Sequence, residues 1–191
     1  MSGNAFRGLE NTLQTLNLAG NSLRSVPVEA LRQLRLLRQL DLTGNQIKYV
    51  PDNAFVTLRL KTLKLADNAD LSLSPNSLRG LETSLKNLNL KGCFFKQVPT
   101  AALRNLKGLT FLDLAQNNLR QIAVGALNGL DSLTALNLER NVIQRLDPLV
   151  FMGVNNSLSS LSLLNNLLTD FPIEALNSLK ELRVRKKHAS H

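Results

Sequence analysis

The stretch "LRQLDLTGNQI", residues 37–47, decides the fold because it recurs along the whole chain. Each copy follows the pattern Leu-x-x-Leu-x-Leu-x-x-Asn-x-Leu, with a few exchanges, and successive copies start 23 to 25 residues apart. General leucine richness does not produce seven copies in so regular a register, so the pattern indicates a stacked repeat architecture. The copies begin at Leu13, Leu37, Leu60, Leu85, Leu109, Leu133 and Leu158.

The leucines at the fourth and sixth positions of each copy predict a short strand. Side chains alternate along a strand, so these two leucines point into the core and the residue between them points to solvent. One copy is too small to bury its apolar face, but stacked copies share one continuous core. The sequence therefore predicts a curved α/β repeat solenoid with a parallel β-sheet on its concave face.

The second half of each repeat returns the chain to the next strand. Pro27, Pro51, Pro99 and Pro172 restrict the backbone where four of these return legs begin. The legs are too short for long helices, so we expect short 3₁₀ or irregular segments on the convex side. A second apolar row along these legs consists of Phe6, Leu31, Phe55, Leu78, Leu103, Leu127, Phe151 and Leu176.

The repeat pattern also predicts the domain organisation. We expect one array over residues 1–184, with a partial repeat at 1–12, seven repeats over 13–181, a truncated eighth from 182, and a basic tail at 185–191. Residues Gly8, Gly80 and Gly153 begin similar insertions three repeats apart, which indicates duplicated triplets. Because neither end carries a polar capping unit, we expect a fragment of a longer array.

Composition narrows the function classes. The net charge is +9, from 23 Lys+Arg and 14 Asp+Glu, but the basic residues are scattered except in the tail. A solvated surface therefore fits better than a nucleic-acid groove. No apolar run approaches the roughly 18 residues of a membrane span, and the first residues do not form a signal peptide. The single cysteine has no partner for an internal disulfide.

The repeat unit resembles the typical, 24-residue class of leucine-rich repeats found in extracellular receptors and adhesion proteins. The half-repeat "Asn-x-Leu-x-x-Val/Ile-Pro-x-x-Ala-Leu/Phe" carries this resemblance, and the three-repeat insertion rhythm is similar to chaoptin-type adhesion proteins. The resemblance implies a leucine-rich-repeat horseshoe that binds proteins on its concave face, at the cell surface or in secreted form. An intracellular, cytoplasmic scaffold and a secreted matrix protein that binds acidic glycans stay open as alternatives.

The outward-facing strand residues form the candidate binding surface. Phe111 is an aromatic residue at such a position, and aromatic residues are favoured interface anchors. Charged residues of both signs surround it, which suits a protein partner; packing over neighbouring strand side chains is the alternative. The candidate binding residues are Gln39, Asp41, Thr62, Lys64, Asn87, Asn89, Lys91, Phe111, Asp113, Asn137, Glu139 and Arg140.

The ninth position of each repeat predicts a structural ladder at the ends of the strands. Its asparagine amides can pair with backbone groups that would otherwise be buried unpaired. Cys93 takes this position in the fourth repeat, where a small buried thiol fits, and we expect it to be a poor nucleophile. The ladder residues are Asn21, Asn45, Asn68, Cys93, Asn117, Asn141 and Asn166.

Catalysis finds little support in the sequence. No catalytic motif appears, Asp41 and Asp113 are three repeats apart, and His188 and His191, the only histidines, lie in the tail. We therefore expect no enzyme, no cofactor and no metal site. Asn155 begins the one candidate glycosylation sequon. The expected partner is a protein, or an acidic glycan, and not a nucleic acid; membrane association would come only through other parts of a full-length protein.

Overall fold

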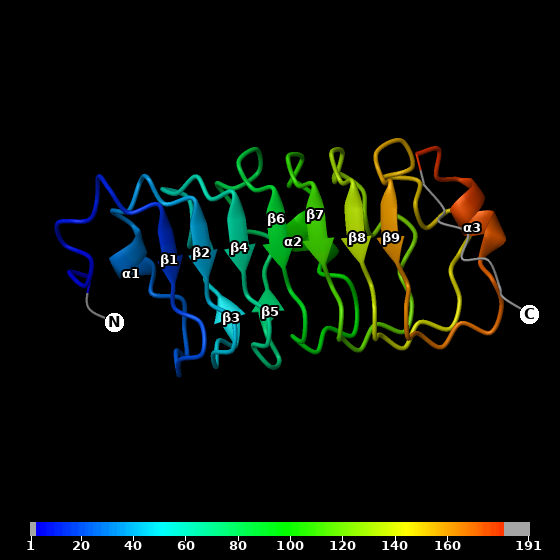
Figure 1. The fold of residues 1–191 in the computed structure, drawn as a ribbon, viewed down its shortest axis with the longest axis horizontal. Coiled ribbons are helices and arrows are strands. Elements are labelled where there is room, and N and C mark those ends of the chain that lie inside the picture. Colours follow the sequence, from blue (N-terminus) through cyan, green and yellow to red (C-terminus); the bar gives the residue numbers. More distant parts are fainter. Residues whose placement is uncertain (1–2, 182–191) are drawn as a thin grey trace, which may run out of the picture.

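The structure is a computed structural model, and it describes residues 3–181. Its main feature is a seven-stranded, fully parallel sheet in which each strand pairs with the strand of the next repeat (Figure 1). This confirms the predicted solenoid. The predicted eighth repeat and the basic tail lie outside the described residues. The seven strands are β1 Thr15–Asn17, β2 Gln39–Asp41, β4 Thr62–Lys64, β6 Asn87–Asn89, β7 Phe111–Asp113, β8 Ala135–Asn137 and β9 Ser160–Ser162.

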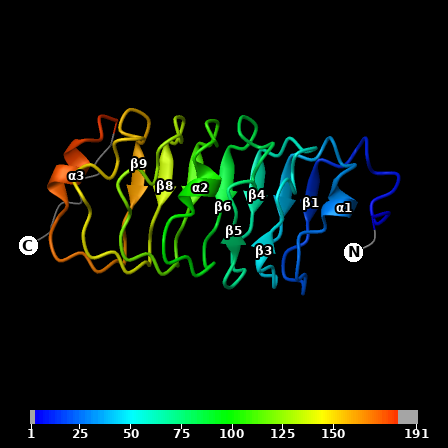
Figure 2. The same cartoon turned by 180° about the vertical axis from the view of Figure 1, so that it is seen from behind.

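The first and last described repeats lie at opposite ends of the solenoid, and sequence order follows its long axis (Figures 1 and 2). A second, two-stranded parallel sheet pairs β3 (Tyr49–Val50) with β5 (Ser72–Leu73) below the main sheet. The repeat pattern did not predict this sheet. Three short helices complete the described elements: α1 Val28–Leu31, α2 Thr100–Leu103 and α3 Ile173–Asn177.

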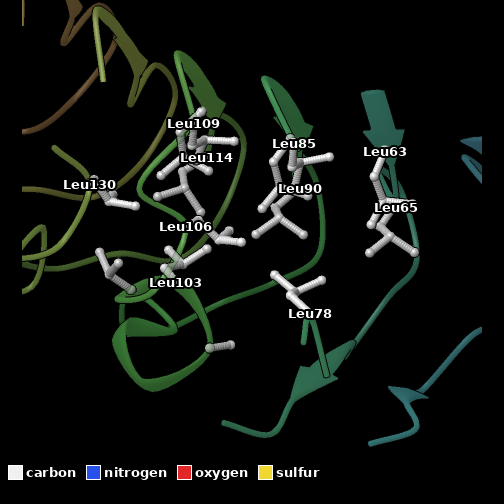
Figure 3. Close-up of a cluster of buried hydrophobic side chains, with 14 of the residues drawn as sticks. Leu63, Leu65, Leu78, Leu85, Leu90, Leu103, Leu106, Leu109, Leu114 and Leu130 are labelled. Carbon is white, nitrogen blue, oxygen red and sulfur yellow. The ribbon is translucent and has the colours of Figure 1, made fainter. Parts of the chain in front are cut away.

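The core lies between the main sheet and the return legs. Figure 3 shows leucines of the strand side, such as Leu63, Leu90 and Leu114, facing leucines of the return legs, such as Leu103 and Leu106. All five are 0 to 1% exposed. Burying one leucine side chain stabilises a protein by roughly 1.5–3 kcal/mol, so the stacked leucines supply the main driving force for this fold.

Three return legs contain one α-helical turn where we expected 3₁₀ or irregular structure. In the leg after Pro27, the Leu31 N–H donates to the Pro27 carbonyl and the Arg32 N–H donates to the Val28 carbonyl, at 3.1 and 3.0 Å. These are i to i+4 bonds, which define the α-helix rather than the 3₁₀-helix. The other described legs consist of turns, as we expected.

A left-handed residue explains the absence of a helix in two of the return legs. Glu29 precedes the Ala-Leu pair of a helical leg, whereas Asn53 and Gly125 take the same place in two non-helical legs. Asn53 has φ +60° and Gly125 has φ +81°. Those left-handed conformations interrupt a right-handed turn, so helix formation stops there.

The eighth position of every repeat also adopts a left-handed conformation. It closes the tight turn between the strand and the asparagine ladder, with φ between +53° and +67°. Glycine adopts this conformation without strain, whereas other L-residues do so at a cost. Three repeats use glycine and four do not; the seven residues are Gly20, Gly44, Asp67, Gly92, Gln116, Arg140 and Asn165.

Candidate functional site

The solvent side of the seven-stranded sheet, which we call the sheet face, brings most of the candidate binding residues into two rows. In the first row, Gln39, Thr62, Asn87 and Phe111 are register partners on consecutive strands. The second row, from the fifth position of each repeat, runs through Asp41, Lys64, Asn89, Asp113 and Asn137. Residues from five repeats therefore meet on one continuous surface.

Most side chains of the second row have a structural role as well. The Oδ1 atom of Asp41 accepts the N–H of Thr43, and Oδ1 of Asp113 accepts the N–H of Ala115, both at 3.0 Å. The same bond, from the N–H two residues further on, forms at Asn17, Asn89 and Asn137. Short side chains with an oxygen acceptor favour such local turns. The row thus holds the strand ends in place and leaves the remaining polar atoms toward the sheet face.

The sheet face around Asp41 neutralises its own charge. Lys64 lies beside Asp41 on the next strand, and its Nζ atom is 3.1 Å from Oδ2 of Asp41. Partial burial alone would raise the pKa of Asp41, but hydrogen bonds from Thr43 and Lys64, with the charge of Lys64, outweigh it. The pKa of Asp41 is therefore below its ordinary value. This part of the face presents a closed ion pair.

The sheet face around Phe111 differs. We expected Phe111 to project into solvent. Instead, it is half-buried between Asn87 and Ala135. Asp113, two residues on, is only 9% exposed, which contradicts the expectation of a solvent-facing carboxylate. Its neighbours across the sheet, Asn89 and Asn137, bring no positive charge. Burial raises the pKa of Asp113, and the Ala115 N–H and the charge of Lys91 offset this only in part.

The remaining candidate residues surround this position. Lys91 and Glu139 are half-buried on either side of Ala115, and Glu139 accepts the hydroxyl of Ser162 at 2.6 Å. Arg140 is exposed, but it occupies the left-handed turn beyond β8 and not the strand itself. Lys91 has no ion pair among residues 3–181. The centre of the sheet face thus combines an aromatic side chain, a buried carboxylate and charges of both signs.

The ninth-position asparagines lie at the strand ends and connect neighbouring repeats. The Asn117 amide donates to the carbonyls of Leu90, Leu114 and Ala115, and its Oδ1 accepts the N–H groups of Cys93 and Phe95. Asn45, Asn68, Asn141 and Asn166 repeat this arrangement with small variations. Asn21 is exposed and donates only within its own repeat.

Cys93 takes the asparagine position without leaving a backbone donor unpaired. Its Sγ donates to the carbonyls of Leu65 and Lys91, at 3.2 and 3.5 Å. The repeat before it carries one extra residue, and as a result the Leu71 N–H donates to the Asn68 carbonyl. In other repeats that N–H needs an asparagine Oδ1. Burial raises the pKa of the Cys93 thiol to about 11, so the reactive thiolate is scarce at neutral pH.

The other candidate features are placed as follows. Asn155 is half-buried in a turn, where its carbonyl accepts the N–H of Lys180. His188 and His191 lie outside the described residues. Within residues 3–181, no three His, Cys, Asp or Glu side chains gather where they could hold a metal ion. In the same range, no helix has the length and apolar content needed to cross a membrane.

Sequence reasoning missed a groove beside the ladder, on the edge where the strands end. It is lined by Lys96, Gln97, Asn118, Arg120, Gln121 and Val142 and has a volume of about 730 Å³. A signal for it existed, because the twelfth position is basic in four repeats: Arg24, Lys48, Lys96 and Arg120. These residues are far apart in the sequence and form one surface only when the repeats stack.

Comparison with known proteins supports one family. The sequence profile described as leucine rich repeat matches residues 1–47, 11–69 and 83–143. A comparison with curated protein sequences finds no match.

Several solved structures are similar to this one. TLR13, in a complex with ssRNA13, has a TM-score of 0.85 and 33% identity, over 94% of this chain and 25% of that protein. A leucine-rich repeat protein of Leptospira interrogans has a TM-score of 0.72 and 30% identity, over 89% and 47%. Toll of Drosophila, in a complex with Spatzle, has a TM-score of 0.73 and 21% identity, over 95% of this chain and 27% of that protein. The chain therefore spans between a quarter and a half of these proteins.

Proposed function

This chain belongs to the leucine-rich repeat family, and from that membership we propose that it binds a protein partner on the sheet face around Phe111. Proteins of this fold generally act as binding modules, and two of the similar structures are complexes, of TLR13 with ssRNA13 and of Toll with Spatzle. The proposed module performs no catalysis of its own and needs no cofactor.

The observation that carries the proposal is the combination at β7. Phe111 is the aromatic residue of the seven described strands of the main sheet, and it lies two residues before the buried carboxylate of Asp113. A raised pKa without an ion pair means that the fold tolerates an unfavourable charge there. Binding sites tolerate such costs more often than purely structural surfaces do.

The charge balance of the sheet face favours a protein over a nucleic acid. The face has no excess of positive charge, because its strands carry two basic residues, Lys64 and Lys91, and three acidic residues, Asp41, Asp113 and Glu139. Nucleic-acid surfaces, in contrast, depend on many cations that contact phosphates. The mixed charges around an aromatic centre resemble the anatomy of a protein interface.

The location of the protein is part of the proposal. We infer a cell-surface or secreted adhesion or receptor protein, on the basis of the repeat type, the chaoptin-like insertion rhythm and the likeness to TLR13 and Toll. Glycosylation of Asn155 would agree with this location. The alternative is an intracellular scaffold that uses the same sheet face.

The test compares Phe111→Ala with Thr15→Ala, which changes the same strand position in repeat 1, outside the set of candidate binding residues. Each variant is immobilised and exposed separately to the secreted and the cytosolic proteins of the source organism, and captured proteins are quantified by mass spectrometry. We expect the wild type and Thr15→Ala to capture a set of secreted proteins that Phe111→Ala no longer captures.

Thermal unfolding of both variants provides the control, because Phe111→Ala should remain folded at the capture temperature. Equal capture by both variants would contradict binding at Phe111. A Phe111-dependent set that comes from the cytosolic fraction alone would favour the intracellular scaffold.

A further inference from the structure

We propose that the groove on the strand-end edge of the solenoid, lined by Lys96, Arg120 and Arg145, binds a linear sulfated or carboxylated glycan. This edge is the one toward which the strand arrows of the main sheet point, after β6, β7 and β8 (Figure 1). It is separate from the sheet face, so this site and the proposed protein site can be occupied independently.

The groove extends across three repeats. Its larger part, of about 730 Å³, contains Lys96 and Arg120, and a second part of about 320 Å³ contains Arg145. Gln121 lines both parts, which makes them neighbours. A recess that follows the solenoid axis suits a linear polymer better than a compact headgroup.

The cations of the groove are not neutralised by the part of the chain that the structure describes. No carboxylate lies within ion-pair distance of Lys96, Arg120 or Arg145 among residues 3–181. Lys48, at the twelfth position of repeat 2, differs because its Nζ is 3.3 Å from Oδ2 of Asp70. The basic charge is thus neutralised at repeat 2, whereas the groove cations of repeats 4 to 6 have no ion pair within residues 3–181.

The three charges come from three different repeats: Lys96 and Arg120 hold the twelfth position of repeats 4 and 5, and Arg145 holds the thirteenth position of repeat 6. Each of three successive repeats contributes one cation, and parallel strands place neighbouring repeats about 4.8 Å apart. The larger part of the groove has no carboxylate, and Asp147 is the one acidic residue of the second part. One Asp147 oxygen already accepts the N–H of Leu149. The result is a row of positive charge that a polyanion can follow.

The other lining residues favour a glycan over a nucleic acid. Asn118, Gln97 and Gln121 present amides, which can both donate to and accept from sugar hydroxyl groups. No lining residue is aromatic, although single-stranded nucleic acids are usually held by bases that stack on aromatic side chains. Charged groups and hydroxyl groups together are the chemistry of sulfated and uronate-containing glycans.

The probe for the test is heparin, with affinity measured by surface plasmon resonance at several salt concentrations. In the groove variant, Lys96→Gln, Arg120→Gln and Arg145→Gln are combined. A matched variant, Arg35→Gln with Arg104→Gln and Lys107→Gln, removes the same charge from exposed positions elsewhere. A third variant replaces Arg185, Lys186 and Lys187 of the tail by glutamine.

We expect the groove variant to lose about tenfold or more in affinity, because three charge-assisted contacts disappear. The slope of log affinity against log salt should fall by about two to three, as for a polyanion that loses three neutralised charges. The matched and tail variants should each change the affinity less than threefold. Arg120→Lys should restore most of the binding that Arg120→Gln loses.

Three outcomes would overturn the proposal. Equal losses in the groove and matched variants would mean that net charge alone attracts heparin. A loss confined to the tail variant would place the contact outside the groove. If single-stranded RNA displaced heparin at a lower concentration of negative charges than free heparin does, the groove would be assigned to nucleic acid.

Retained heparin binding by Phe111→Ala would show that the two sites are separate.

Discussion

Repeat 2 (residues 37–59) and repeat 5 (residues 109–132) occupy equivalent places in two successive triplets, yet their sheet faces differ. Asp41 and Asp113 hold the same position and form the same bond to the N–H two residues later. The pKa of Asp41 is lowered, whereas that of Asp113 is raised. The backbone role of the residue is therefore constant, and its electrostatics are not.

The cause is the neighbouring strand. Asp41 has Lys64 beside it, whereas Asp113 has Asn89 and Asn137. In a solenoid each repeat contacts only its neighbours, so a change in the adjacent repeat is enough to alter a charge. The comparison teaches that function can vary along this array without any change in the repeat that carries it.

The largest effect should come from a feature that the two repeats share. We expect Asn117→Ala to lower the free energy of unfolding by about 3 kcal/mol and Asn45→Ala by about 2, because each leaves buried backbone groups unpaired. Asn117 accepts two N–H groups, whereas Asn45 accepts one. Urea denaturation followed by circular dichroism measures both. Asn21→Ala is the control, and a loss as large as that of Asn117→Ala would break the argument.

The next largest effect is expected at the eighth position, where substitutions in repeat 2 and repeat 5 should change stability in opposite directions. Gly44 has φ +64° and Gln116 has φ +53°. A new Cβ at Gly44 would meet backbone atoms only at 3.6 Å, so the cost of Gly44→Ala is conformational, about 1 kcal/mol. Gln116→Gly should stabilise by about 0.5 kcal/mol, since strain is released and partly offset by chain entropy. Thermal midpoints that shift in the same direction would contradict this.

The two aspartates should respond to pH in opposite directions. With a raised pKa, the folded state at Asp113 binds more protons than the unfolded state, so stability falls as pH rises from about 4 through that pKa. Asp113→Asn keeps the Oδ1 acceptor and should stabilise the protein at pH 7. Asp41→Asn should destabilise at pH 7, because a lowered pKa contributes stability that is lost only as pH falls through it.

Denaturation of these variants at pH 7 and pH 3 provides the measurement. Both differences from the wild type should shrink at pH 3, where Asp113 is protonated and where Asp41 of the unfolded state is mostly protonated. The same sign for both variants at pH 7 would show that the cross-strand neighbour does not control the charge.

The smallest effect is expected at Cys93, in repeat 4 between the two repeats compared. Cys93→Asn should change stability by less than about 1 kcal/mol, because the amide gains bonds to Leu65 and Lys91 while its Oδ1 finds no donor at Leu71. A thiol reagent should label the native wild type far more slowly than the urea-unfolded chain. Fast labelling of the native protein would contradict the buried position.

The sequence was sufficient to predict the fold because the leucine positions and the asparagine position are local and repeated. The helical legs were not predicted, although Asn53 and Gly125 carried a signal for two of the legs that are not helical. Their effect depends on a single φ angle, which the shared leg pattern conceals.

The candidate site was only partly predictable. The rows of the sheet face follow from strand alternation, so their membership could be read directly. The burial of Asp113 could not be predicted, because it depends on side chains of the repeats on both sides of it. The groove around Arg120 required knowledge of the volume between repeats, which no linear pattern contains.

The ladder has a consequence for how the protein reaches its fold. The ladder bonds that connect neighbouring repeats join residues 21 to 28 positions apart, all along the array. Folding slows when native contacts close long loops, but here every loop has the same modest length. The array can therefore nucleate at any well-packed pair of repeats and extend in both directions, so that added repeats need not lengthen the slowest step.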